Sequence, residues 1–260
     1  AMHWPFYQPK TARGVRRSTL HDRLAARGAC FGETAGWERA NWFAPEGVEP
    51  VYQYSYGRQN WFDYSGDECR AVRTAVGMFD QSSFGKYVVK GPDAEKVLNR
   101  ISANDMSVPV GKLVYTQWLN ERGGIEADLT VTREAEDRYL VVTAAATQTR
   151  DLAWLEDHLG DDRAVVVDVT SSMATLSVMG PNSRALLSGL TDADLSNEAF
   201  PFGTSQIIDM GYARAEDSRV TFVGELGWEL YIPTEFAQGV FEQRSRLTRT
   251  ISAAATGTGA

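Results

Sequence analysis

The chain has 260 residues, of which 43% are hydrophobic and 11% aromatic, with a formal net charge of −8. This composition supports one large or two small domains with a sizeable core. No apolar run approaches the ~18 residues that a bilayer-spanning helix needs, and no secretory signal opens the chain. Two cysteines, Cys30 and Cys69, exclude a disulfide framework and predict a reduced, cytoplasmic protein. The three histidines and two cysteines have no zinc-type spacing, so we expect no metal.

The start of the chain is a basic arm in front of an acidic body. Residues 1–42 carry seven Lys or Arg and three Asp or Glu, a net charge of +4, so the remainder carries −12. A basic segment of this kind can bind nucleic acid. The arm has no groove-binding or base-stacking motif, which favours docking on acidic surface of its own or a neighbouring domain. We therefore expect no nucleic-acid partner and no membrane partner.

The hydrophobic pattern predicts helices and strands that alternate along the chain. Residues 1–50 are irregular apart from a short helix over 19–27 that Ser18 caps. Further helices are predicted over 67–78, 92–101, 147–159, 181–190 and 234–243. Strands are predicted over 85–90, 113–119, 125–132, 139–143, 164–169, 174–179, 206–213, 219–223 and 228–232. Strand–helix units mixed with hairpins indicate an α+β fold with mixed or antiparallel sheets. The small residues of 244–260 indicate a flexible tail.

One segment of the chain occurs twice, 89 residues apart and without a gap. Residues 87–107 and 176–196 each read as an apolar strand, a Gly-Pro turn, a short amphipathic helix and an Asp-apolar-Ser sequence. Because a whole supersecondary unit is used twice, we expect a pseudo-symmetric domain. Positions at which the two copies differ are then the places to look for chemistry.

Asp105 is the first candidate for chemistry. It follows the helix of the first copy, and Asp194 has the same place in the second. A carboxylate there often only accepts backbone N–H groups of a turn, an interpretation that suits Asp194. The continuation differs, because a strand with Tyr115 follows Asp105, whereas the same offset gives Thr204 in the second copy. Asp105 and Tyr115 therefore form a candidate reactive pair, with a structural turn as the alternative.

Glu229 is the second candidate. It interrupts the apolar sequence Trp-Glu-Leu-Tyr-Ile over 228–232. If the carboxylate faces inward it needs a partner, because burial of a lone charge is costly. The alternation is equally compatible with a Glu229 that faces solvent on a half-buried strand.

Four motifs follow one another in order along the chain. They are Val-Tyr-Thr at 114–116, Asn-Glu-Arg-Gly-Gly-Ile-Glu-Ala-Asp-Leu-Thr-Val at 120–131, Met-Gly-Pro at 179–181 and Gly-Glu-Leu-Gly-Trp-Glu at 224–229. Together they resemble the folate-binding domain of the glycine-cleavage T-protein (aminomethyltransferase) family over residues 46–243. The arm, residues 1–45, instead resembles the segment that joins the flavin half to the folate half in dimethylglycine and sarcosine dehydrogenases. The resemblance implies a pseudo-symmetric T-protein-like domain behind a linker arm.

The resemblance also implies roles for individual residues. Asp105 matches the family's essential aspartate beside folate N5 and N10, and Glu229 matches the glutamate that holds the pterin ring. Tyr115 matches an aromatic position lining the pocket, and Phe222 stands where the family has a tyrosine. A carboxylate can accept both the ring N–H and the exocyclic amino group of a pterin edge. An anionic Asp105 would stabilise a developing cation and take up a proton from a folate nitrogen.

The implied function is tetrahydrofolate-dependent one-carbon (aminomethyl or iminium) transfer that forms 5,10-methylenetetrahydrofolate. The expected ligands are folate and a donor derived from a small methylated amine. No Gly-x-Gly-x-x-Gly follows a strand here, so FAD would sit on a flavin domain that this chain lacks. The family's closing segment has no match after residue 243, so the chain is expected to be cut short. Two alternatives remain, a stand-alone aminomethyltransferase of the glycine-cleavage type and a non-catalytic folate-binding fragment.

Overall fold

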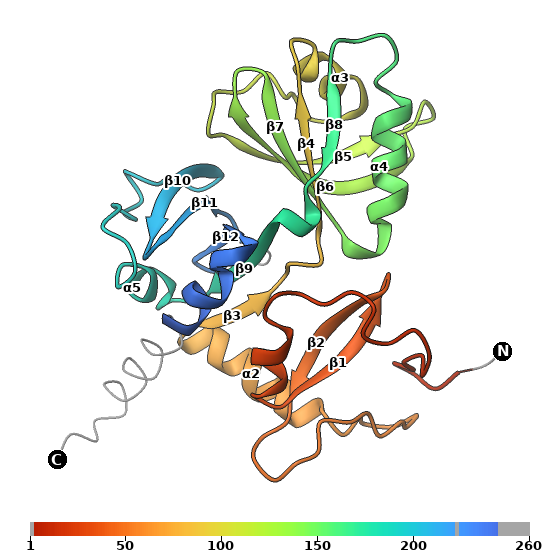
Figure 1. The fold of residues 1–260 in the computed structure, drawn as a ribbon, viewed down its shortest axis with the longest axis vertical. Coiled ribbons are helices and arrows are strands. Elements are labelled where there is room, and N and C mark those ends of the chain that lie inside the picture. The colour runs from red at the N-terminus through yellow and green to blue at the C-terminus, as the bar shows by residue number, and fades with distance from the viewer. Residues whose placement is uncertain (1–2, 222–223, 244–260) are drawn as a thin grey trace.

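The computed structural model describes residues 3–221 and 224–243, which form an α+β fold around two five-stranded antiparallel sheets (Figure 1). Sheet I has the order β5-β6-β7-β4-β8 and sheet II the order β10-β11-β12-β9-β3. The strands of sheet I are β4 Gly85–Lys90, β5 Leu113–Leu119, β6 Ile125–Ala135, β7 Arg138–Thr143 and β8 Val165–Asp168. Those of sheet II are β3 Gly77–Asp80, β9 Met173–Met179, β10 Thr204–Met210, β11 Ala213–Arg219 and β12 Gly227–Pro233. The predicted α+β class is confirmed.

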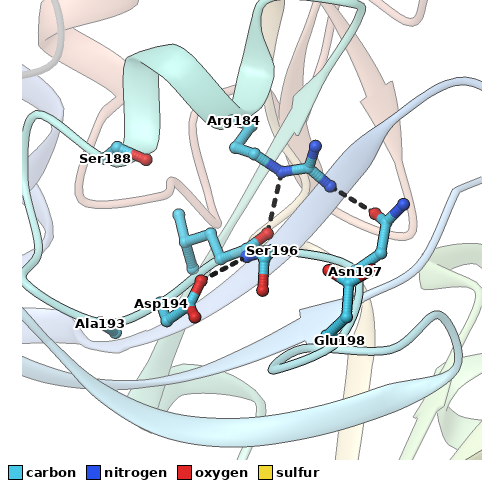
Figure 2. A pocket seen from close by; sticks show the side chains of 8 residues that line it. Arg184, Ser188, Ala193, Asp194, Ser196, Asn197 and Glu198 are labelled. Carbon is cyan, nitrogen blue, oxygen red and sulfur yellow. Dashed lines mark hydrogen bonds between the residues drawn. The ribbon is translucent and has the colours of Figure 1, made fainter.

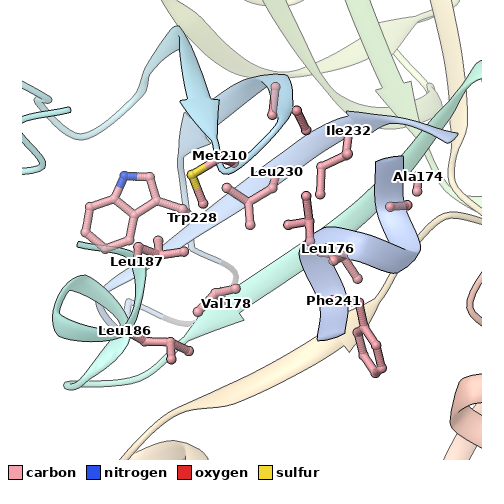
Figure 3. Packing of buried hydrophobic residues seen from close by; sticks show 14 of the residues in the cluster. Ala174, Leu176, Val178, Leu186, Leu187, Met210, Trp228, Leu230, Ile232 and Phe241 are labelled. Atoms are coloured by element: carbon pink, nitrogen blue, oxygen red, sulfur yellow. The ribbon is translucent and has the colours of Figure 1, made fainter. Parts of the chain in front are cut away.

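Helices pack on the outer face of each sheet. They are α1 His21–Ala25, α2 Phe62–Thr74, α3 Ala94–Ile101, α4 Gln148–Asp157 and α5 Ser183–Leu187, with 3₁₀ turns η1 Ala145–Thr147 and η2 Thr170–Ser172. The chain is again helical over 234–243. Apolar side chains of α3 and α4, among them Leu98 and Leu155, pack on sheet I. Those of α5 and 234–243, among them Leu186 and Phe241, belong to the core of sheet II, which also holds the buried Trp228 (Figure 3).

The prediction of an irregular arm was wrong. Strands β1 Ala29–Thr34 and β2 Trp37–Phe43 form a hairpin, with Thr34 opposite Trp37. The two turn residues, Ala35 and Gly36, have φ of 50° and 82°, the left-handed geometry that tight hairpin turns require. Gly36 therefore makes the turn of a hairpin here rather than breaking regular structure.

The arm contacts its own domain. Ser18 accepts the Leu20 N–H ahead of α1, which begins two residues later than predicted, and its hydroxyl donates to Asp80 of β3. Arg16 Nη2 donates to Gln148 Oε1 at 3.1 Å, and Arg23 pairs with Glu242 at 2.6 Å. Apolar side chains of α1 join the core of sheet II.

Three other predicted elements differ in the structure. The predicted strands over 206–213 and 219–223 are instead β10 and β11, joined by a turn at Gly211 with a φ of 62°. The prediction ran through this turn because β11 is mostly polar in sequence. Helix α2 lies over Phe62–Thr74 rather than 67–78, and the end of the predicted helix belongs to β3.

The two sheets are related by pseudo-symmetry and exchange one strand each. Helix α5 and strand β12 begin 89 residues after α3 and β7, and the pair Val88–Leu140 recurs as Ser177–Glu229. The strand before β4, which is β3, pairs with β9, whereas the strand before β9, which is β8, pairs with β4. Each half therefore supplies an edge strand to the sheet of the other half. Neither sheet is complete without both halves of the chain.

The hairpins β5–β6 and β10–β11, which end the two sheets, do not keep the 89-residue offset. Strand β11 is shifted by three residues against β12, relative to β6 against β7. As a result Tyr115, which pairs with Thr130, corresponds to Ile207, which pairs with Glu216. The prediction that Thr204 is the counterpart of Tyr115 is therefore wrong, because the gap-free repeat ends before this hairpin.

The sheets approach each other through one face each, here called the inward faces. Val88, Leu140 and Val142 of sheet I form a cluster with Tyr231 of sheet II. Tyr115 shares the inward face of sheet I, because it lies opposite Thr130 and Thr130 lies opposite Val142. Glu229 shares that of sheet II, since it is two residues from Tyr231 on the same strand. The fold thus turns the side chains of interest toward the junction of the two sheets.

Two glutamates from different sheets also meet at this junction. Glu216 of β11 is hydrogen-bonded to Glu134 of β6 and accepts the Ser205 hydroxyl at 2.9 Å. Glu134 also accepts a hydrogen bond from Arg138. Burial, followed by the Glu134 carboxylate, raises the pKa of Glu216 to about 9. At neutral pH the Glu216 carboxyl group is therefore protonated.

Replacing the Glu216 carboxyl group by an amide is expected to stabilise the protein. Folding raises the pKa of Glu216 from 4.5 to about 9, so the folded state takes up a proton in that window and stability falls as pH rises through it. Glu216→Gln keeps a donor to Glu134 without proton uptake. Its free energy of unfolding at pH 7 should exceed that of the wild type by about 1–3 kcal/mol. Urea unfolding at pH 5, 7 and 9 measures this, and parallel pH profiles for the two proteins would contradict it.

Candidate functional site

Tyr115 and Asp128 form a hydrogen-bonded pair on the inward face of sheet I. The Tyr115 hydroxyl, on β5, donates to Asp128 Oδ2, on β6, at 2.9 Å, and Gln117 Nε2 lies 3.4 Å from Asp128 Oδ1. Both members of the pair are exposed. The hydrogen bond to Asp128 raises the pKa of the Tyr115 hydroxyl, which remains a donor at neutral pH. A carboxylate oriented by a neutral phenol and open to solvent can stabilise a cation or accept a proton.

Asp128 was missed as a site residue in the sequence. It lies within the motif at 120–131, but equal counting from the turn, where Leu119 pairs with Ile125, would place Ala127 opposite Gln117. A register shift between Trp118 and Leu119 instead puts Asp128 opposite Gln117, with Tyr115 as its diagonal neighbour on the same face.

Asp105, the aspartate predicted to be catalytic, lies in an exposed turn. Its Oδ1 accepts the Ser107 N–H at 2.8 Å. The adjacent Asn104 donates from Nδ2 to the backbone oxygen of Tyr115 at 2.7 Å, which ties the turn to the middle of β5. The turn therefore lies beside the strand that carries Tyr115. The catalytic role of Asp105 stays a prediction.

The counterpart Asp194 makes the same turn in the second half. Its Oδ1 accepts the Ser196 N–H at 2.8 Å, and this bond holds the pKa of Asp194 below its ordinary value (Figure 2). Arg184 stabilises the segment by donating to Leu195 O at 2.8 Å and to Asn197 Oδ1 at 2.6 Å. The two aspartates thus have the same local geometry. Any difference in their chemistry must come from what surrounds each turn.

Glu229 lies on the inward face of sheet II, between Ser177 of β9 and Ser218 of β11. It is partly buried, and its Oε2 accepts the Tyr231 hydroxyl at 2.7 Å. Burial raises the pKa of Glu229, while the hydrogen bond from Tyr231 and the positive charge of Lys86 lower it. Of the two orientations that the sequence left open, the structure has the inward one, with Tyr231 as the partner.

The two hydrogen-bonded pairs belong to different sheets. Tyr115 and Asp128 come from sheet I and Glu229 from sheet II, with Tyr231 packed between the inward faces. Phe222, the fourth predicted site residue, lies outside the described residues. In the described ranges 3–221 and 224–243, no group of three or more His, Cys, Asp or Glu side chains could hold a metal ion. Over the same ranges, no helix has the length and apolar character to cross a bilayer.

Comparisons with known proteins assign the chain to a family. The GCVT N-terminal domain matches residues 20–260. The chain is 47% identical over 242 residues to 4-methylaminobutanoate oxidase (formaldehyde-forming) of Paenarthrobacter nicotinovorans, a match that covers 93% of this chain and 29% of that protein. Human mitochondrial sarcosine dehydrogenase is 36% identical over 269 residues, with 88% and 29% covered. The chain thus spans less than a third of the length of these two relatives.

A solved structure confirms the fold. The glycine cleavage system aminomethyltransferase T from Bartonella henselae has a TM-score of 0.71 to this structure at 26% identity, over 89% of this chain and 57% of that one. The motifs quoted from the sequence, the doubled architecture and the family match agree with one another. The chain belongs to the GCVT N-terminal domain family, with relatives among the sarcosine and dimethylglycine dehydrogenases and the aminomethyltransferases.

Proposed function

We propose that this chain is the tetrahydrofolate-dependent one-carbon transfer domain of a dimethylglycine or sarcosine dehydrogenase-like enzyme, forming 5,10-methylenetetrahydrofolate. The observation that carries the proposal is the placement of two carboxylates, each oriented by a tyrosine hydroxyl, on the inward faces of two adjoining sheets. One is partly buried Glu229 and the other is exposed Asp128. The first suits recognition of a heterocycle and the second suits proton transfer.

Glu229 fits the pterin end of folate. A pterin presents a ring N–H beside an exocyclic amino group, and a carboxylate can accept both in a bidentate pair. Tyr231 bonds to Oε2 of Glu229, which leaves further lone pairs on the carboxylate for such a pair. The partly buried position strengthens hydrogen bonds to the charged group.

Asp128 fits the reacting end. Tetrahydrofolate, when bound, supplies the nucleophilic nitrogens that take up the one-carbon unit. Asp128 would hold the proton that a folate nitrogen loses, while the Tyr115 hydroxyl fixes the orientation of its carboxylate. Its negative charge would also stabilise the positive charge of an iminium donor. Asp105, in the neighbouring turn, is the competing candidate for this role.

The proposal is tested first by binding. Titration with tetrahydrofolate should give a saturable change in the fluorescence of the seven tryptophans. Glu229→Gln should weaken binding by about 10- to 100-fold, because an amide cannot accept both pterin donors. Glu121→Gln, an exposed change in the β5–β6 turn, is the matched control and should bind like the wild type. Absence of saturable binding by the wild type would refute the proposal and leave a non-catalytic module.

Product analysis separates two outcomes of one-carbon transfer. The name of the 47% identical relative describes it as formaldehyde-forming, so free formaldehyde is a second candidate product. With an iminium donor and tetrahydrofolate, the proposal expects methylenetetrahydrofolate to form at the expense of formaldehyde. Formaldehyde released at the same rate with and without folate would favour the second candidate. The proposal includes an amine-derived donor and a partner flavin domain. A stand-alone aminomethyltransferase is the alternative to it.

A further inference from the structure

Lys86 is a fully buried lysine beneath the proposed pterin site. It lies on β4 with none of its surface exposed, and its Nζ donates to the backbone oxygens of Ser82 at 3.0 Å and Phe84 at 2.9 Å. No other lysine or arginine belongs to the buried set of the described residues. A buried ammonium destabilises a fold unless hydrogen bonds and nearby negative charge compensate for it. A buried lysine in this position therefore calls for an explanation.

The surroundings of Lys86 lead to Glu229. Lys86 pairs with Val142 of β7, and Val142 packs against Tyr231, whose hydroxyl donates to Glu229. The ammonium attracts three carboxylates, those of Asp80, Asp168 and Glu229.

Two of these carboxylates already have several hydrogen-bond donors. Asp80 accepts bonds from Ser18 and Ser82. Asp168 accepts the Gln148 amide at 3.0 Å and the Thr170 N–H at 2.8 Å. Glu229, by contrast, accepts one bond within the described part of the chain, from Tyr231. Glu229 is therefore the carboxylate of the three that has capacity for a ligand.

We propose that Lys86 is a positioning residue that keeps Glu229 ionised and compensates its charge, so that the site selects the neutral donor pair of a pterin over a cationic amine. This inference rests on the proposed function. A carboxylate without a fixed countercharge would attract the methylammonium groups of the donor. Lys86 offsets one negative charge of this cluster, so hydrogen-bond geometry counts for more, and charge for less, in what binds at Glu229 than it would without the lysine. The donor is then directed away from Glu229.

The titration of the cluster defines when this arrangement holds. Burial raises the pKa of Glu229, and Lys86 counteracts that rise. Burial lowers the pKa of Lys86 to about 8, against the attraction of Asp80 on β3, Asp168 on β8 and Glu229 on β12. Tyr231, which faces Glu229 and the Glu216 carboxyl of β11, has its pKa raised by burial and stays neutral. Pterin binding should therefore weaken on the acid side as Glu229 protonates, and on the alkaline side above about pH 8 as Lys86 loses its charge.

The test is the pH profile of tetrahydrofolate binding between pH 5 and 10, by tryptophan fluorescence. Lys86→Arg should extend tight binding to higher pH, because a guanidinium stays charged where Lys86 does not. Lys86→Met should weaken binding about tenfold at pH 7 and move the acid limb to higher pH by about one unit. Dimethylamine should compete better in Lys86→Met than in the wild type. Lys96→Met, which removes an exposed lysine paired with Asp162, is the matched control and should leave the profile unchanged.

Several results would overturn the role of Lys86. One is a Lys86→Met profile that superimposes on that of the wild type; another is an alkaline limb that Lys86→Arg leaves in place. If Lys86→Met does not fold, as judged by circular dichroism, the alkaline limb of Lys86→Arg decides alone. In the double variant with Glu229→Gln, Lys86→Met should have no further effect on binding, and an undiminished effect would also contradict the proposal. Failure of the wild type to bind at any pH would refute the proposed function itself.

Discussion

Asp128→Asn is expected to lower the rate of methylenetetrahydrofolate formation by about 10²–10⁴-fold and to leave tetrahydrofolate binding nearly unchanged. The amide keeps the size of the side chain and can still accept the Tyr115 hydroxyl, but it cannot take up a proton or carry negative charge. Single-turnover formation of product from an iminium donor measures the rate, and fluorescence titration measures binding. Equal losses in both would mean that Asp128 only supports the hairpin.

Asp105→Asn and Asp194→Asn complete this comparison. Both aspartates accept the N–H of the serine two residues later at 2.8 Å, so the two variants should perturb the fold equally. Asp194→Asn thus reports what loss of the turn carboxylate does by itself. If Asp105→Asn reduces the rate far more than Asp194→Asn and Asp128→Asn does not, the proton-accepting role belongs to Asp105. If Asp105 and Asp194 behave alike, Asp105 is a turn residue.

Gly91→Ala and Gly180→Ala are each expected to lower the free energy of unfolding by about 2–4 kcal/mol. The two glycines open the Gly-Pro turns of the repeat and have φ of 141° and 123°, which residues with a Cβ rarely adopt. A Cβ on Gly91 would lie 2.2 Å from the backbone oxygen of Arg163, and one on Gly180 would lie 2.6 Å from that of Ala75. Backbone atoms cannot move aside as a flexible side chain can. Urea unfolding of the variants measures the loss.

Gly47→Ala is the matched control for these variants. Gly47 has a φ of 83°, but no atom lies within 4 Å of the position that a Cβ would take, so the change strains the backbone without a clash. Its expected effect is about 1 kcal/mol. If Gly91→Ala is no more destabilising than Gly47→Ala, close approach is not the reason for glycine in the turn.

The contacts of these glycines explain the repeat that stands out in the sequence. Gly91 lies against Arg163, just before β8, and Gly180 lies against Ala75, just before β3. These are the two strands that cross to the other half's sheet. Asn182 N–H bonds to Ala75 O at 2.9 Å, and Asp93 N–H approaches Arg163 O at 3.4 Å in the same way. The repeated motif is therefore where each half anchors the exchanged strand, and its recurrence within the chain reflects architecture rather than chemistry.

The periodic parts of the chain could be read from local pattern. β4 and β5 lie where the alternation of apolar residues predicted them, and the end of α3 and the start of β6 agree as well. These segments bury apolar side chains in a core, on both faces in the case of β4, and local hydrophobicity therefore marks them. β2, with its turn at Ala35 and Gly36, and β11, which is mostly polar, have no such pattern and were missed or misplaced. Their pairing partners, rather than their own composition, make them strands.

Local sequence was thus enough for the α+β class, the repeat, the family resemblance and the candidacy of Tyr115 and Glu229. The exchange of β3 and β8, the three-residue shift of the outer hairpin, the Tyr115–Asp128 pair and the burial of Lys86 under Glu229 all depend on tertiary structure. Each arises from contacts between residues distant in sequence, in which strand register decides which side chains share a face. A side chain's neighbours across a sheet set its charge and its hydrogen bonds. Those neighbours cannot be identified from the residues adjacent to it in the sequence.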